Sequence, residues 1–387
     1  TYDTQRKDWN AMNIALLGHG TVGRGVDEII TERVEGVDVT RILELPDRLS
    51  DPRMTASYDD IVGDPEIELV VECMGGLEPA HTFISAALAA GKSVVTSNKA
   101  VVAEHFGEFA RQARTSGAAL FIEATCAGGI PWIASIQKAR RIDDVTSFSG
   151  IMNGTTNFIV DAMLREGADF DVILGRAQEL GYAERDPSAD IDGIDVRNKT
   201  LIAACVAFDV DCAREFPVTG IRTLTKADLD LLSRHGRTAK LLGRGAQADG
   251  RYAVAVEPVA LPKSSLEANV PANFNLVTLE GTTVGPLKFY GQGAGMLPTG
   301  NAIVQDVLDY MQDIRPSYDF SRDLAYDPAL LSSDYLFMTT ASVAASEPFD
   351  EGAVLVRDIS AQRARTLLGE ALETDAASFM AAFPQEG

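Results

Sequence analysis

The residues most able to do chemistry fall in one short stretch, GYAERDPSADIDGIDVRNK at 181–199. Five carboxylates occur there within nineteen residues, and a lysine follows four positions after the last of them. Such a stretch is most often a solvated acidic loop, but carboxylates can also hold a cationic substrate beside a lysine that exchanges a proton. The residues concerned are Glu184, Asp186, Asp190, Asp192, Asp195 and Lys199.

Asp195 and Lys199 are i and i+4 at the predicted start of a helix whose later turns are apolar. They lie on one helical face with the acid N-terminal to the base, which is the favourable order. One interpretation is a surface ion pair, which contributes only a few tenths of a kcal/mol. The other is acid/base catalysis, in which one group gives a proton in one direction of a reaction and takes it back in the reverse direction. A lysine can do both if burial or a nearby cation lowers its pKa.

A second lysine, Lys99, follows a predicted parallel strand at 93–96. Lysine is scarce here, with nine among 34 basic residues, so its position is informative. Ligands bind beyond the carboxyl ends of the strands in open α/β sheets. Lys99 is therefore either a site residue or a lysine that simply starts a surface helix. If Lys99 and Lys199 meet across a domain cleft, each lowers the pKa of the other.

A glycine turn, GHGTVG at 18–23, stands between a predicted strand at 12–17 and a predicted helix. Gly18 permits the tight turn, Gly20 lets a pyrophosphate approach the backbone, and Gly23 lets the helix pack closely on the strand. The helix N-terminus then faces the phosphates. In this strand–turn–helix context the pattern predicts a dinucleotide-binding site.

The end of the next predicted strand, at 37–45, bears on which nucleotide binds. Glu44 lies 21 positions after Gly23, where an acidic residue can bind the ribose hydroxyls of NAD. Arg41 and Arg48 are close enough in sequence to accept the 2′-phosphate of NADP instead. The sequence leaves both cofactors open and favours NAD slightly.

Strands alternate with helices through the N-terminal third of the chain, which predicts an α/β fold with a Rossmann-type, doubly wound parallel sheet. We expect a dinucleotide-binding domain at 1–134, completed by a helix at about 295–315. Residues 135–294 mix helices with strands that alternate in an antiparallel fashion, which indicates a second, α+β domain. The tail at 330–387 is predicted to be a small C-terminal extension with two strand-like runs and one helix.

The composition limits the partners and the compartment. The net charge of −22 repels nucleic acid and anionic membranes, so we expect neither as a partner. No apolar run reaches the roughly 18 residues that a bilayer-spanning helix needs, and the N-terminus is not signal-like. The four cysteines form no C-x-x-C pair and no disulfide framework, which favours a reducing cytoplasm. They are Cys73, Cys126, Cys205 and Cys212.

Six blocks of this sequence together resemble the homoserine dehydrogenase family. The most specific are GIMNGTTNFI at 150–159 and LGYAERDPSADIDGIDVRNK at 180–199. The others are GHGTVG at 18–23, SNK at 97–99, EATCAGGIP at 123–131 and GQGAGMLPTG at 291–300. The resemblance implies a homodimeric, NAD(P)-dependent enzyme that interconverts L-homoserine and L-aspartate 4-semialdehyde. It also implies that the second domain, at 135–294, binds the substrate and forms the dimer.

The resemblance also implies roles for individual residues. Lys199 is the expected catalytic acid/base, and Lys99 is expected to assist at the reacting oxygen. The expected substrate-binding residues are Glu184, Asp190, Asp195 and Gly181. The expected cofactor contacts are Gly18, Gly20, Thr21, Val22, Gly23, Glu44, Met74, Gly75, Ser97, Lys99 and Gly295.

The block at 123–131 resembles the monovalent cation site of the family. Glu123, with the backbone carbonyls of Cys126, Gly128 and Ile130, is expected to hold sodium there. The alternative for Glu123 is a strand-end carboxylate in water.

The sequence also departs from the family in two places. ILELPDR at 42–48 stands where many members carry an arginine, which weakens an NADP assignment. The tail has too few elements for a complete ACT domain, so it is either a reduced copy or an extension that supports a dimer.

Two other functions are compatible with the sequence. One is a related dehydrogenase that acts on another amino acid or aldehyde. The other is a non-catalytic sensor that binds the dinucleotide and reports it to a partner. The presence of both lysines together with the acidic residues favours an enzyme over the sensor.

Overall fold

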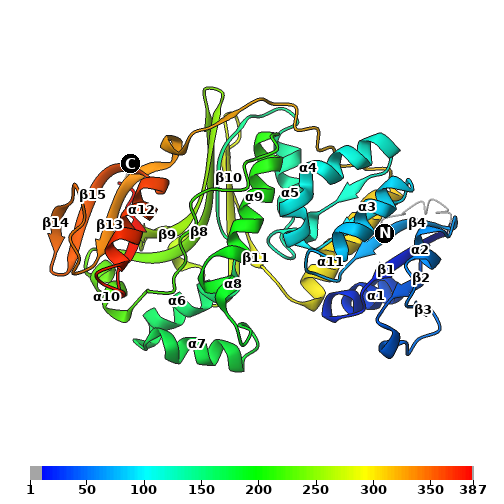
Figure 1. Ribbon diagram of the computed structural model, residues 1–387, viewed down its shortest axis with the longest axis horizontal. Coiled ribbons are helices and arrows are strands. Elements are labelled where there is room, and N and C mark those ends of the chain that lie inside the picture. The colour runs from blue at the N-terminus through cyan, green and yellow to red at the C-terminus, as the bar shows by residue number, and fades with distance from the viewer. Residues whose placement is uncertain (1–10, 386–387) are drawn as a thin grey trace, which may run out of the picture. The chain divides into compact units, whose positions relative to one another are not determined.

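The computed structural model describes residues 11–385, which divide into two compact units. The first unit comprises residues 11–134 and 294–320, and the second comprises the rest. The helices and strands of both units are labelled in Figure 1.

The first unit is built on a six-stranded parallel sheet in the order β3-β2-β1-β4-β5-β6. The strands are β1 (Met12–Leu17), β2 (Val37–Leu43), β3 (Met54–Thr55), β4 (Ile67–Glu72), β5 (Ser93–Thr96) and β6 (Leu120–Phe121). The helices are α1 (Thr21–Arg33), α2 (Asp59–Val62), α3 (Ala80–Ala89), α4 (Lys99–Ser116), the start of α5 (Trp132–Ala139) and α11 (Met296–Met311). This strand order is that of a doubly wound dinucleotide-binding fold, so the predicted fold class is confirmed.

The core on one face of this sheet joins three elements that are distant in sequence. Ile14 and Leu16 of β1 point to the same side because strand side chains alternate, and they pack with Val26 of α1 and Ile303 of α11. The two helices approach closely at Gly25, where a Cβ would lie 2.7 Å from the carbonyl oxygen of Met296. Helix α11 therefore completes the first unit from far along the chain.

The second unit is a mostly antiparallel sheet in the order β11-β10-β7-β8-β9-β16-β13-β15-β14, with β12 beside β9. The strands are β7 (Val145–Ile151), β8 (Arg237–Ala248), β9 (Arg251–Pro262), β10 (Phe274–Gly281), β11 (Gly285–Gln292), β12 (Ala325–Tyr326), β13 (Ser332–Met338), β14 (Glu347–Asp350), β15 (Ala353–Ser360) and β16 (Phe379–Ala382). The helices are α6 (Gly154–Glu166), α7 (Phe170–Glu179), α8 (Ser188–Ile191), α9 (Ile194–Phe208), α10 (Lys226–Arg234) and α12 (Ala361–Leu372). The predicted α+β character of this part is confirmed.

Strand β8 lies in the middle of this sheet, although the sequence did not indicate a strand there. It carries a buried lysine, Lys240, which obscures the apolar pattern of a central strand. The Nζ of Lys240 donates to Oδ1 of Asn157 at 2.6 Å and to the carbonyl oxygen of Val270 at 2.9 Å, and burial lowers its pKa to about 8. Helix α9 lies directly on β8, since a Cβ on Gly243 would be 2.0 Å from Oγ1 of Thr200.

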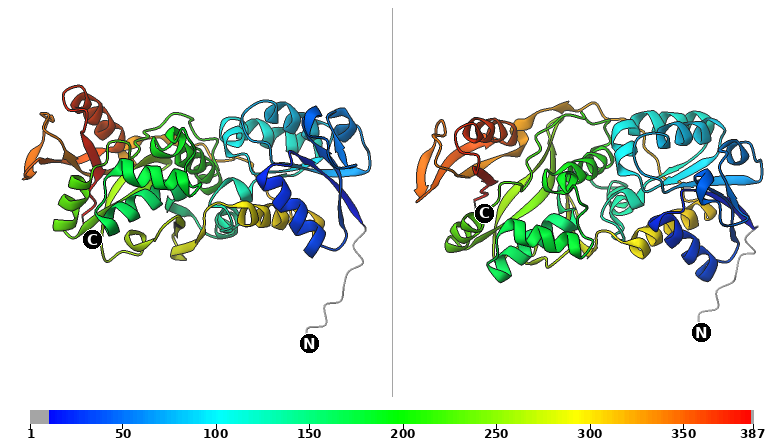
Figure 2. Two further views of the ribbon diagram at one scale, coloured as in Figure 1. Left: turned by 90° about the horizontal axis from the view of Figure 1, so that it is seen from below. Right: turned by 60° about the horizontal axis from the view of Figure 1, so that its bottom comes forward.

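The C-terminal segment, as far as it is described, extends the same sheet. Strand β16 pairs with β9, and β13 pairs with β16 and β15. Helix α12 lies against β13, β15 and β16 and buries Ala364 and Leu367 in their common core (Figure 2). The tail therefore joins the second unit instead of forming a separate layer.

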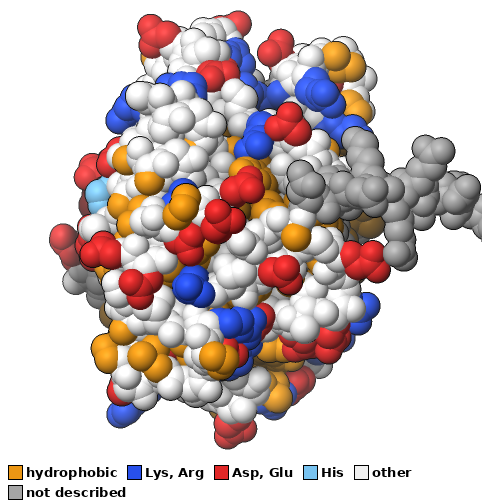
Figure 3. Space-filling model, turned by 90° about the vertical axis from the view of Figure 1, so that its right-hand side faces the viewer, with side chains coloured by type: hydrophobic (Ala, Val, Ile, Leu, Met, Phe, Trp, Pro, Cys, Tyr) orange, Lys and Arg blue, Asp and Glu red, His pale blue; other side chains and the backbone are white. Residues whose placement is uncertain are grey.

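Figure 3 shows acidic and basic side chains interspersed over one face of the molecule. The excess negative charge is therefore spread over this face and not gathered in one patch.

Among the helices that the structure describes, none combines the length and apolar character needed to cross a membrane.

Candidate functional site

The glycine turn links β1 to α1 and leaves the first turn of α1 without a side-chain cap. Gly18 has a φ of +93°, a conformation that favours glycine. A Cβ on Gly23 would lie 2.2 Å from the carbonyl oxygen of Gly18, whereas one on Gly20 would meet nothing within 4 Å. Thr21 and Val22 begin the helix beside this open space, so the turn suits an anion such as a pyrophosphate.

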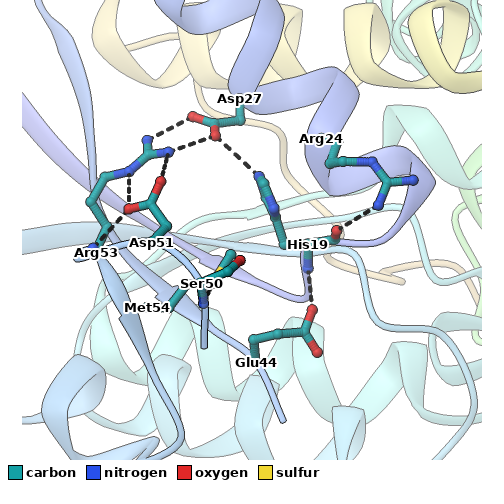
Figure 4. Close-up of polar contacts among 8 residues, drawn as sticks. All are labelled: His19, Arg24, Asp27, Glu44, Ser50, Asp51, Arg53 and Met54. Atoms are coloured by element: carbon teal, nitrogen blue, oxygen red, sulfur yellow. Dashed lines mark hydrogen bonds and ion pairs between the residues drawn. The ribbon is translucent and has the colours of Figure 1, made fainter. Parts of the chain in front are cut away.

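Glu44 follows β2 directly, and its carboxylate is held beside the glycine turn (Figure 4). Its Oε1 accepts the N–H of Leu45 at 2.9 Å, and its Oε2 accepts the N–H of His19 at 3.2 Å. These backbone hydrogen bonds, the one from Leu45 above all, hold the pKa of Glu44 below its ordinary value. Glu44 is therefore an ionised acceptor near the turn, as a partner of ribose hydroxyls must be.

Figure 4 also shows a charged cluster next to Glu44 that the sequence did not indicate. The guanidinium of Arg53 donates to the two oxygens of Asp27 at 2.8 and 2.9 Å and to Oδ1 and Oδ2 of Asp51 at 3.0 and 2.9 Å. Asp27 also lies 3.1 Å from Nε2 of His19. Two carboxylates therefore engage Arg53. This arginine is neither of the two, Arg41 and Arg48, that the sequence offered for the 2′-phosphate of NADP.

A buried carboxylate sets the loop that follows β4. Glu72, the last residue of β4, accepts the N–H groups of Met74 and Gly75 at 2.8 and 3.2 Å. Oγ1 of Thr96, at the end of β5, donates to the same carboxylate at 2.5 Å. Burial raises the pKa of Glu72. The two loop residues expected to contact the cofactor are thus oriented by a side chain inside the sheet.

Lys99 is the first residue of α4, at the carboxyl edge of β5. Asn98 caps this helix by accepting the N–H of Val101 at 3.2 Å, and its Nδ2 donates to the carbonyl oxygen of Gly76 at 2.7 Å. The N–H of Lys99 donates to the carbonyl oxygen of Ser97 at 3.1 Å. The cap therefore joins this edge to the loop after β4.

Gly295 precedes α11 with a φ of +127°, and a Cβ there would lie 3.3 Å from Cδ of Pro298. Because α11 belongs to the first unit, Gly295 shares that unit with the glycine turn and with the loops after β2, β4 and β5. All the expected cofactor contacts therefore lie within one unit.

The second unit brings Lys199, Asp195 and Asp190 together around Asn153. The Nζ of Lys199 donates to Oδ2 of Asp195 and to the carbonyl oxygen of Met152, both at 2.7 Å. Lys199 is 8% exposed and Asp195 is 9% exposed. The predicted helical pair is therefore a nearly buried ion pair, so the interpretation as a solvated surface pair is wrong.

Asn153 is a central residue of this network that the sequence reasoning missed. As the N-cap of α6, its Oδ1 accepts the N–H of Thr156 at 2.8 Å. Its Nδ2 donates to Oδ1 of Asp190 at 2.7 Å and to Oδ2 of Asp195 at 2.9 Å. Burial, and to a lesser extent the charge of Asp195, raises the pKa of Asp190. The available signal was an asparagine a few residues before a helix expected at about 156–166.

The other members of the acidic stretch are not in this network. Glu184 is exposed, and Gly181 follows the end of α7 with a φ of +75°. Asp186 accepts a backbone N–H two residues later at 3.1 Å, and Asp192 pairs with Arg222 at 2.6 Å. These last two residues shape the loop.

Glu123 lies between β6 and α5 and is nearly buried, so the interpretation as a carboxylate in water is wrong. Its two oxygens accept the N–H groups of Ile133 and Ala134, in the first turn of α5, at 2.9 and 2.7 Å. Burial raises the pKa of Glu123 to about 7. Asp306 of α11, also buried and with its pKa raised by burial, accepts the N–H of Glu123 at 3.1 Å.

The loop that follows Glu123 turns tightly. Ala127 and Gly128 have φ values of 56° and 58°, and the carbonyl oxygen of Ile130 accepts the N–H of Trp132 at 2.7 Å. Backbone and carboxylate oxygens beside two buried acids form a donor set that fits a hard cation.

Two family models match this chain. A model described as homoserine dehydrogenase matches residues 131–308, and one described as homoserine dehydrogenase, NAD binding domain, matches residues 18–123. A homoserine dehydrogenase from Synechocystis sp. is 39% identical over 337 residues, which are 82% of this chain and 77% of the relative.

Solved structures agree with these matches. A homoserine dehydrogenase from Thiobacillus denitrificans is 30% identical, with a TM-score of 0.86 over 97% of this chain and 99% of its own. A hyperthermophilic archaeal homoserine dehydrogenase in complex with NADPH is 25% identical, with a TM-score of 0.69 over 79% of this chain and 99% of its own. These matches favour the dehydrogenase over the sensor and over a dehydrogenase for another substrate. With a nucleotide-binding first unit and these relatives, the chain belongs to the homoserine dehydrogenase family of NAD(P)-dependent oxidoreductases.

Proposed function

We propose that this chain interconverts L-homoserine and L-aspartate 4-semialdehyde, with Lys199 exchanging the proton. In the oxidation, a hydride leaves the terminal carbon of homoserine for the nicotinamide, and the hydroxyl proton passes to a base. In the reduction both transfers reverse. The observation that supports this role most strongly is the nearly buried cluster of Lys199, Asp195 and Asn153.

Lys199 suits proton transfer because its position is set before any substrate binds. Asp195 and the carbonyl oxygen of Met152 each accept from its Nζ at 2.7 Å, so little reorganisation is needed. The neutral amine takes the hydroxyl proton in the oxidation, and the ammonium returns it in the reduction. Lys99 is the proposed assisting group at the reacting oxygen.

The acidic residues are the proposed binding site for the polar groups of homoserine. Asp190 and Asp195 share one amide donor, and the charge of Asp195 contributes to the raised pKa of Asp190. A substrate ammonium group placed between them would relieve this repulsion. We assign Glu184 and Gly181, on the loop before α8, to the same binding surface.

The test is the formation of NADH or NADPH with L-homoserine at alkaline pH for the wild type and for Lys199→Ala. We expect kcat to fall by at least about a hundredfold in the variant, the usual scale for loss of a general acid/base. Lys226→Ala, which removes an exposed lysine that pairs with Asp230 in the same unit, is the matched control.

Circular dichroism should show that both variants are folded. A tenfold or smaller loss in Lys199→Ala would leave Lys199 a structural role only. Absence of turnover by the wild type with either nucleotide, while the nucleotide still binds, would exclude the proposed reaction.

We propose NAD as the preferred nucleotide. The 2′-phosphate of NADP would lie beside the ionised carboxylate of Glu44, which disfavours it electrostatically. Arg53 is already engaged by Asp27 and Asp51. Arg24 donates to the carbonyl oxygen of His19 at 3.4 Å. The 2′-hydroxyl of NAD can instead donate to Glu44.

We also propose that sodium binds at Glu123, through its carboxylate and the backbone carbonyls of Cys126, Gly128 and Ile130. Burial raises the pKa of both Glu123 and Asp306, and a cation beside them would stabilise their ionised forms. The ion would neutralise this charge and hold the loop. Thermal unfolding in sodium chloride and in tetramethylammonium chloride tests this, and equal midpoints would contradict it.

We further propose that the chain forms a homodimer and acts in the cytoplasm. Strand β11 ends the sheet of the second unit and exposes Leu287 and Tyr290, and such edges are usually covered or paired. Light scattering should give twice the chain mass of 41.4 kDa, and a monomeric mass would contradict the dimer.

The four cysteines are free thiols, as expected in a reducing compartment. Fractionation of the source cells tests the location.

A further inference from the structure

Two of the four histidines of this chain lie together in the first unit and belong to neither the proposed cofactor site nor the proposed sodium site. His81 is in the first turn of α3, and His105 and Glu108 are one helical turn apart on α4. Each contributes one ligand atom to a group in which all such atoms lie within 4.8 Å of one another. Within residues 11–385, no other set of three histidine, cysteine or acidic side chains meets this condition.

Two of the three spacings between ligand atoms match those of a tetrahedral metal site, and the third is within 4.8 Å. Nε2 of His81 and Nδ1 of His105 lie 3.2 and 3.3 Å from the same oxygen, Oε2 of Glu108. Two ligands bonded to Zn²⁺ at about 2.0–2.1 Å in tetrahedral geometry are about 3.3 Å apart. An ion can therefore enter with small side-chain movements.

The two imidazole rings are arranged to act together. They stack with their centroids 4.0 Å apart and their planes 27° apart. His105 has φ −117° and ψ 16°, which interrupts the helical geometry of α4 at that residue. The side chains of His81, His105 and Glu108 are 24%, 28% and 37% exposed, so a metal ion and a water ligand have access.

A second set of residues supports the ligands in the way that metal sites require. The other ring nitrogen of His81, Nδ1, lies 3.2 Å from Oε1 of Glu78, whose Oε2 accepts from Oγ1 of Thr82 at 2.8 Å. Nε2 of Gln112 donates to Oε1 of Glu108 at 3.1 Å. Histidine ligands usually donate their second N–H to a carboxylate, which fixes the ring and strengthens the ligand.

We propose that His81, His105 and Glu108 bind a divalent transition-metal ion, with Zn²⁺ as the best fit and water as the fourth ligand. Two imidazoles and one carboxylate suit Zn²⁺, Co²⁺ or Ni²⁺, whereas Mg²⁺ and Ca²⁺ prefer oxygen alone. The ion would join the start of α3 to the middle of α4. The site is separate from the proposed sodium site, which has oxygen donors only.

The test is equilibrium dialysis of the untagged, metal-stripped chain against Zn²⁺ and Co²⁺. Salt at about 0.15 M suppresses weak attraction of cations to the acidic surface. We expect one ion per chain, a Co²⁺ visible spectrum without thiolate charge-transfer bands, and a higher Tm with Zn²⁺.

His81→Ala and His105→Ala should each abolish these effects. His235→Ala, which removes a histidine that pairs with Asp350 in the other unit, should leave them unchanged. Glu78→Gln offers a milder change, because Glu78 is 62% exposed and lies outside the ligand set. It should weaken Zn²⁺ binding by about 10- to 100-fold, as loss of a supporting carboxylate does.

Several results would overturn the proposal. Binding that persists in the His81→Ala and His105→Ala variants would place the ion elsewhere. Equal affinity in Glu78→Gln and the wild type would do the same, even if the alanine variants fail to fold. Absence of stoichiometric binding by the wild type would mean that the three side chains form only hydrogen bonds.

Discussion

The side chain of Asn153 has two roles, because it caps a helix and also orients two carboxylates. Substitutions can separate these two roles. Its Oδ1 caps α6, and its Nδ2 holds Asp190 and Asp195. Serine caps helices about as well as asparagine, whereas alanine does not. Asn153→Ser should therefore keep the cap and lose the amide donor, and Asn153→Ala should lose both.

The contacts set the expected size of each effect on the free energy of unfolding. Loss of the cap costs about 1 kcal/mol. A hydrogen bond to a charged group contributes about 1.5–3 kcal/mol. The lower end applies here, since Asp195 keeps Lys199 at 2.7 Å and the half-buried Asp190 can take up water. We expect losses of about 2 kcal/mol for Asn153→Ser and about 3 kcal/mol for Asn153→Ala.

Urea unfolding measures these losses, and turnover of L-homoserine measures the effect on the site. Both variants lose the amide donor that positions Asp190 and Asp195. If this loss weakens transition-state binding by about 2 kcal/mol, kcat/KM should fall by about thirtyfold in both. Asn269→Ser is a matched control. The Nδ2 of Asn269 donates to the carbonyl oxygens of Lys263 and Ser265, both at 2.7 Å, on an exposed turn of the same unit. Wild-type kcat/KM in Asn153→Ser, or equal stability of Asn153→Ser and Asn153→Ala, would refute this reasoning.

Four further predictions concern the first unit. Glu123 has a pKa of about 7 in the folded state, against 4.5 when unfolded. Between these two pH values the folded state binds more protons than the unfolded state. The free energy of unfolding should therefore fall by about 3 kcal/mol as the pH rises from 4.5 to 7. Glu123→Gln should flatten that dependence in sodium-free urea titrations, and an unchanged slope would contradict the assignment. Glu44→Ala should raise KM for NAD selectively, whereas an unaltered ratio of NAD to NADP activity would exclude the proposed ribose contact. Gly23→Ala should lower stability by about 1–3 kcal/mol and weaken NAD binding, because its Cβ meets the backbone 2.2 Å away. Gly20→Ala should weaken NAD binding alone, and a loss of stability there equal to that of Gly23→Ala would argue against open space at Gly20.

Much of the fold and part of the site were predictable because they depend on neighbours in sequence. The glycine turn needs only contiguous residues between a strand and a helix, so Gly18, Gly20 and Gly23 were identifiable. Asp195 and Lys199 share a helical face through their four-residue spacing, which the period of the helix sets. Element boundaries were less exact, since the strand predicted at 37–45 ends at Leu43.

Tertiary structure decided what lies beside these local features. Asn153 meets Asp190 and Asp195 across 37 and 42 residues, and Arg53 meets Asp27 across 26. No periodicity encodes such pairs, because they arise where separate elements pack together. Burial likewise decided between the two interpretations of Asp195 and Lys199, since the pair is nearly buried and not at the surface.

By itself, then, the sequence determined the doubly wound domain, the nucleotide turn and the helix that carries Lys199, since each follows from short-range patterns. Only the tertiary structure decided that β8 is a central strand despite Lys240, that Glu123 is buried beside Asp306, and that His81 meets Glu108. The physical reason is the same in each case: burial and long-range contacts depend on how the elements pack, and packing is a property of the whole chain.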